Sequence, residues 1–108
     1  MDGQVIDILG TKYSIWYRPM KDVEIDGECD YTSKEIHIRS DNHNEVGNFE
    51  WLQKKSLRHE IIHAFMAESG LCSNWEHTQQ FGHDETTVDW FAIQTPKIYK
   101  VFKELDIA

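Results

Sequence analysis

One segment of the sequence, His59-Glu60-Ile61-Ile62-His63, has the residue types and the spacing that suit metal-assisted hydrolysis. On a helix, residues four apart lie one above the other, so two imidazoles can each offer a nitrogen to one zinc ion. Glu60 is turned by about 100° from His59 and would lie beside the metal, where it can take a proton from a zinc-activated water. The segment therefore predicts a zinc site with His59 and His63 as ligands and Glu60 as the general base.

The helix that must carry this motif is predicted from Phe49 to Ser69, a stretch without glycine or proline. Asn48 suits the N-cap of such a helix, and Gly70 suits the position that follows its C-terminus. Small residues flank the motif one turn away on the same face and leave room above a metal. The opposite side carries an apolar stripe that would pack on a sheet, formed by Leu57, Ile61, Ala64 and Phe65.

The first forty residues predict the sheet. Apolar residues alternate with polar ones around residues 13–18, and Pro19 ends this pattern. Asp26-Gly27 indicates a turn, and a second pair of strands follows, Glu28 to Tyr31 and Glu35 to Arg39. In the last strand Ile36 and Ile38 lie on one face, and the opposite face carries Glu35, His37 and Arg39. We expect a small, mostly antiparallel sheet.

Two more helices are predicted after a loop over residues 70–83. The first runs from Glu85 to about Gln94, with Asp84 as a cap. In the second, Thr95 would be the N-cap and Pro96 the first residue, and the helix would continue to the C-terminus. The predicted fold is α+β, a single domain over residues 1–108 in which the sheet packs on the long helix.

A third zinc ligand must come from outside the HExxH segment. The metzincin continuation fails, because Met66 and Ser69 stand where that pattern needs glycine and histidine. A carboxylate on the following helix is a common alternative. Glu85 is therefore the expected third ligand, and Asp89, one turn later, would accept the outer N–H of a ligand imidazole. The remaining candidates for the third ligand are His77, His83 and Asp84.

The composition restricts the partners. The net charge is −8, which argues against a nucleic-acid or anionic-membrane surface. No segment resembles a signal peptide or a membrane span, so we expect a cytoplasmic protein in which Cys29 and Cys72 are reduced.

The alternative to an enzyme is a non-catalytic interaction module with a closed, four-ligand metal site. For an enzyme, the side chain that stabilises the oxyanion stays open among Tyr31, Arg58, His77 and His83.

Two segments together resemble the ImmA/IrrE family of zinc metallopeptidases. The second motif of that family reads approximately E-x-x-A-N-x-F-A and is followed by a proline. Here Glu85 stands at the family's glutamate ligand, Phe91-Ala92 match, and Asp89 replaces the usual asparagine. The resemblance covers approximately residues 27–96 and rests on Leu57–Phe65, Glu85–Ala92 and Pro96.

This resemblance implies a gluzincin-like fold with a small sheet, an active-site helix and a glutamate-bearing helix. It also implies Zn²⁺ as the cofactor and a protein or peptide as the substrate, often a repressor-type regulator of bacteria, phages and mobile elements. No helix-turn-helix or sensor segment accompanies the motifs in this sequence, which favours a stand-alone enzyme of the phage or prophage type.

Overall fold

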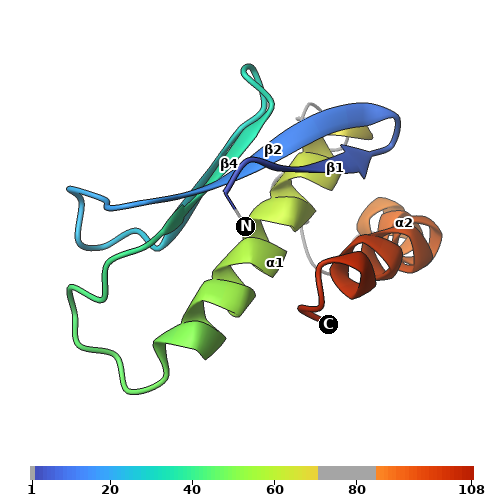
Figure 1. Ribbon diagram of the computed structural model, residues 1–108. Helices are drawn as coiled ribbons and strands as arrows, with labels where there is room; N and C mark the ends of the chain where they lie inside the picture. Colours follow the sequence, from blue (N-terminus) through green and yellow to red (C-terminus); the bar gives the residue numbers. More distant parts are fainter. Residues whose placement is uncertain (1, 71–84) are drawn as a thin grey trace.

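The computed structural model describes residues 2–70 and 85–108, except for the side chains of Glu85, Thr86, Val88, Asp89 and Ala92. Four strands precede two helices, which confirms the predicted α+β class (Figure 1). Neither of these helices combines the length and the apolar character needed to cross a membrane. The elements are β1 (Gln4–Ile8), β2 (Thr11–Arg18), β3 (Gly27–Asp30), β4 (Glu35–Arg39), α1 (Phe49–Glu68) and α2 (Glu85–Glu104).

The sheet is mixed, with the strand order β1-β2-β4-β3. Its two outer pairs are antiparallel, but the central pair, β2 and β4, is parallel. The prediction of a mostly antiparallel sheet missed this central pairing. The reason lies in burial: Ile36 and Ile38 on β4 are fully buried, whereas alternate residues of β3 are exposed. The more apolar β4 therefore takes the inner position, and β3 forms the edge.

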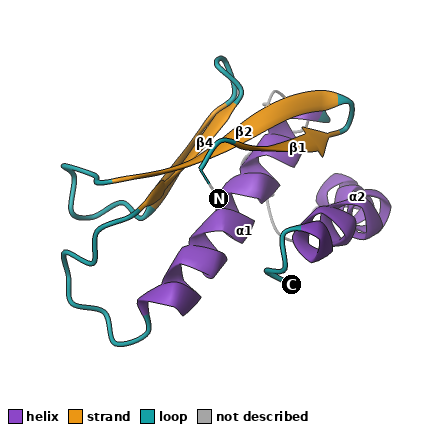
Figure 2. Cartoon of the chain, in the orientation of Figure 1, coloured by secondary structure: helices purple, strands orange, loops and turns teal. Residues whose placement is uncertain are grey.

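Both helices lie on the same side of the sheet, where α1 packs against the strands and α2 packs against α1 (Figure 2). The predicted alternation on β2 is confirmed, because Tyr13 and Ile15 are buried while Ser14 and Trp16, which alternate with them, are partly exposed. The predicted apolar stripe of α1 is also confirmed, since each of its members is at most 3% exposed. The core that joins the sheet to α1 contains Ile6, Ile8, Tyr13, Ile15, Ile36, Ile38, Leu57, Ile61, Ala64 and Phe65.

α1 begins at the predicted Phe49 and ends at Glu68, one residue before the predicted end. The Asn48 side chain accepts a hydrogen bond from the backbone N–H of Trp51 at 3.1 Å. After the C-cap Ser69, Gly70 has a φ of +84°, a conformation that glycine adopts without steric penalty. At the C-terminal end, the Glu68 carboxylate accepts bonds from Thr11 Oγ1, Tyr13 Oη and Lys34 Nζ at 2.7–2.9 Å. These bonds fix α1 against β2 and the β3–β4 turn.

The prediction of two helices after residue 84 is wrong, because α2 is continuous and contains Pro96. Proline lacks the N–H that would bond to a carbonyl one turn earlier, yet the helix continues through it. Thr95 is not an N-cap. Its hydroxyl instead donates to the carbonyl oxygen of Phe91, one turn back inside the same helix. Burial of Ile98 and Val101 in the core holds the second half of α2 in line with the first.

Candidate metal centre

His59 and His63 lie one turn apart on the solvent-facing side of α1. Their Nε2 atoms are 3.1 Å apart, and their ring planes meet at 69°. Two nitrogens that bind one tetrahedral zinc ion at 2.0–2.1 Å are separated by about 3.3 Å. The two Nε2 atoms are thus within hydrogen-bonding distance of each other, and their separation is close to the one that a shared ion needs.

The pKa of His63 also suits a metal. The pKa of His63 is lowered, mainly by partial burial of its ring and to a smaller extent by the charge of His59, although the residue as a whole is exposed. A lowered pKa favours the neutral imidazole, which is the form that binds metal ions.

Glu60 is buried, with 7% of its surface exposed, and shares one hollow with His59 and another with His63. The pKa of Glu60 is raised from 4.5 to about 7, mainly by burial and to a smaller extent by the nearby Glu28 carboxylate. A carboxyl group that titrates near neutrality can both accept and return a proton. A cation held by the two histidines would favour the ionised form and prepare Glu60 to act as a base.

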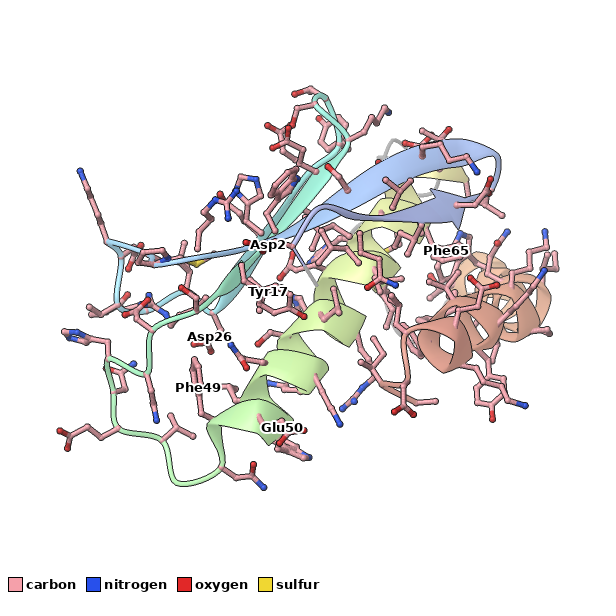
Figure 3. The ribbon with its side chains drawn as sticks, viewed as in Figure 1. Asp2, Tyr17, Asp26, Phe49, Glu50 and Phe65 are labelled. Atoms are coloured by element: carbon pink, nitrogen blue, oxygen red, sulfur yellow. The ribbon has the colours of Figure 1, made fainter. Side chains whose placement is uncertain are left out.

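Two depressions share Glu60 in their walls. One, of about 180 Å³, lies toward His59 and is also lined by Ile25, Asp26, Gly27, Lys55 and Ser56. The other, of about 270 Å³, lies toward His63 and is also lined by Cys29, Tyr31 and Ala67. Figure 3 shows Asp26 between the sheet and the N-terminal half of α1. The motif therefore lines hollows on both sides, as a site for an extended substrate requires. A larger hollow of about 410 Å³, between Leu9 and α2, contains none of the candidate residues.

Gly27, which the sequence indicates only as part of a turn, lies next to Glu60. It is the first residue of β3, and a Cβ atom there would lie 3.2 Å from Glu60 Cγ and 3.1 Å from Ile38 Cδ1. The glycine leaves space for the Glu60 side chain between β3 and α1, because an added Cβ would crowd both of these neighbours. A glycine that directly precedes an alternating strand is the signal that could have identified this close approach.

Arg39 was predicted on the polar face of its strand, but it is only 2% exposed. Its guanidinium lies beneath the segment over residues 19–26, which connects β2 to β3 and supplies Ile25 and Asp26 to the hollow beside His59. The group donates hydrogen bonds to three backbone carbonyls of this segment, those of Met20, Asp22 and Ile25. Arg39 thereby fixes one wall of the candidate site.

The candidates for a third ligand fall outside the described side chains. Glu85 is the first residue of α2 and Asp89 follows one turn later, but the structure describes neither side chain. The alternatives His77, His83 and Asp84 fall in residues 71–84, outside the described part of the chain. Within that part, no three His, Cys, Asp or Glu side chains are grouped so that they could hold a metal ion. Glu85 and Asp89 stay predictions.

Of the residues considered for the oxyanion, two can be located. The Arg58 guanidinium donates to the carbonyl oxygen of Ile107 at 2.8 Å, so it is engaged with the C-terminal end of the chain. Tyr31 is 57% exposed and lines the hollow that also contains Glu60 and His63. Among the described candidates, Tyr31 is thus the one that lies at the site.

Comparison with known proteins adds no family to this description. No protein-family model matches the chain, and searches of curated proteins and of solved structures also found no match. The assignment of a function therefore rests on the chemistry of the site and on the sequence resemblance.

Proposed function

We propose that this protein is a zinc-dependent metallopeptidase that hydrolyses a peptide bond of a protein substrate, with Glu60 as the general base. The observation that carries the proposal is the 3.1 Å separation of the Nε2 atoms of His59 and His63, beside a buried carboxylate. An accidental HExxH on an exposed helical face would need neither this convergence nor the burial of its glutamate.

The donor set fits zinc. Two imidazole nitrogens and one carboxylate are a common ligand set of catalytic zinc sites. In the proposal Glu85 supplies the carboxylate, and Asp89 accepts the outer N–H of a ligand imidazole. The Trp90 indole N–H donates to Ser69 Oγ at 2.6 Å, which ties the N-terminal half of α2 to the end of α1. This link supports a ligand from the start of α2, because α1 carries both histidines.

A zinc ion bound by His59 and His63 would supply a Lewis acid for the scissile carbonyl and would lower the pKa of a bound water. Glu60 takes the proton from the attacking water and returns it to the departing amine. The Glu60 side chain is buried and its Cγ atom lies next to Gly27 at the start of β3, which holds the carboxylate in position. Tyr31 is the described side chain in reach of the hollow that could donate a hydrogen bond to the oxyanion.

The substrate class follows from the resemblance to the ImmA/IrrE family. The proposed substrate is a protein, and repressor-type regulators are the first group to examine. The proposed setting is the cytoplasm of a bacterium that carries a phage or mobile element. The net charge of −8 is consistent with a protein substrate and disfavours nucleic acid.

Turnover by the Glu60→Gln variant tests this proposal. Zinc-loaded wild type, Glu60→Gln and the control Glu50→Gln are incubated with a peptide mixture, and the products are identified by mass spectrometry. Glu50 suits the control, because it lies on the same helix with its side chain 79% exposed. Cleavage by wild type and Glu50→Gln, with none by Glu60→Gln, is the expected result. Equal cleavage by Glu60→Gln would contradict the role of Glu60.

A further inference from the structure

The exposed residues of α1 form one continuous stripe that extends beyond the histidine pair. From Trp51 to the end of the helix, four residues are exposed, and all others are buried or partly buried. The four are spaced at intervals of four, so they lie along one side of the helix. They are Trp51, Lys55, His59 and His63. The candidate metal ligands therefore share a solvent-facing stripe with an aromatic and a cationic side chain.

Apolar side chains are exposed both on this stripe and in the hollow beside His59. Trp51 on the stripe is 57% exposed, and Ile25 in the wall of the hollow is 37% exposed. Ile25 and Lys55 line the same hollow. Exposed apolar residues that border a hollow indicate an interaction surface rather than a solvated helix face.

Lys55 brings a positive charge to this surface. The neighbouring Lys54 lies 3.4 Å from Glu50, but among the described side chains no carboxylate oxygen lies within 4.0 Å of the Lys55 amine. Asp26 lines the same hollow, and its carboxylate lies 4.0 Å from the Arg39 guanidinium. In a chain with a net charge of −8, Lys55 thus remains available to an anionic group of a partner.

The spacing of the stripe fixes where such a group would lie on an extended peptide. Lys55 is four residues and Trp51 is eight residues from His59, which correspond to about 6 Å and 12 Å along the helix. An extended peptide advances about 3.3 Å per residue, so these positions match about two and four residues of substrate.

From this spacing we infer that Lys55 and Trp51 select the substrate on one side of the scissile bond. Lys55 binds an Asp or Glu about two residues from that bond, and Trp51 contacts a large apolar or aromatic residue about four residues from it. This inference rests on the proposed peptidase function and specifies its substrate as an acidic, amphipathic segment of a protein.

The test compares wild type with Lys55→Glu, Trp51→Ala and the control Lys54→Glu, all loaded with zinc. Lys54→Glu makes the same charge change one residue away, on a different side of the helix. A mixture of peptides with randomised positions is digested, and residue preferences around each cleaved bond are read by mass spectrometry. In parallel, binding of labelled acidic and basic peptides of equal length to the four proteins is measured by fluorescence anisotropy in the Glu60→Gln background.

We expect wild type and Lys54→Glu to prefer an acidic residue near the second position and an apolar one near the fourth. Lys55→Glu should shift the acidic-to-basic ratio about fivefold toward basic peptides in both cleavage and binding. Trp51→Ala should lose only the apolar preference. Cleavage with the same preferences in all four proteins would overturn this inference and leave the peptidase function standing. An absence of cleavage by wild type across the whole mixture would instead overturn the peptidase function, and this inference with it.

Discussion

Glu60→Gln should stabilise the metal-free protein at alkaline pH. The wild-type carboxyl is buried between α1 and β3, and its pKa rises from 4.5 to about 7. A group whose pKa is higher in the folded state contributes stability that is fully present below pH 4.5 and is lost as the pH rises through about 7. Glutamine has nearly the same shape and no charge, so the variant avoids this loss.

The size of the effect follows from the pKa difference. The change from 4.5 to about 7 corresponds to about 3 kcal/mol in the free energy of unfolding. We therefore expect Glu60→Gln and wild type to be similarly stable near pH 4 and the variant to be about 3 kcal/mol more stable near pH 8. Zinc held by His59 and His63 would lower the pKa of Glu60, so zinc should shrink the difference.

Urea unfolding of the chelator-treated proteins, followed by circular dichroism across this pH range, measures the difference directly. Other titrating groups are common to both proteins and cancel in the comparison. Glu50→Gln, at an exposed position on the same helix, should show no comparable gain at high pH. A Glu60→Gln difference that stays constant with pH, or that favours wild type near pH 8, would refute the placement of an ionisable, desolvated carboxyl at this site.

Three further predictions concern the surroundings of the site. Gly27→Ala should displace the Glu60 side chain and lower peptide cleavage by about tenfold to hundredfold, while the zinc content measured by mass spectrometry stays at the wild-type level. Glu68→Ala should lower the free energy of unfolding by about 1–3 kcal/mol in urea titrations, because three donors lose their acceptor. Asp89→Ala should weaken zinc affinity by about tenfold to hundredfold and Glu85→Ala by more, as a competing chelator would report. Unchanged affinity in Glu85→Ala would move the third ligand to residues 71–84.

Local signals in the sequence were sufficient for α1. Its cap at Asn48, its stop at Gly70 and its apolar stripe depend on residues within one turn of each other, and all three predictions are confirmed. The placement of His59 and His63 on one exposed side followed from the same helical period.

Features set by distant contacts were not predicted. The parallel pairing of β2 with β4 depends on which strand buries its residues best, and the continuity of α2 through Pro96 depends on core contacts of Ile98 and Val101. The roles of Gly27 and Arg39 depend on elements that approach them from elsewhere in the chain. None of these contacts leaves a periodic pattern in the sequence.

Zinc content of the purified protein tests the central claim most directly. Wild type, Glu60→Gln, His59→Ala and His63→Ala are supplied with zinc, freed of excess metal and analysed by mass spectrometry, with the exposed loop variant His43→Ala as the control. The account predicts stoichiometric zinc in wild type, Glu60→Gln and His43→Ala, and its loss from both ligand variants. Wild type without zinc, or ligand variants that retain as much zinc as the control, would contradict it.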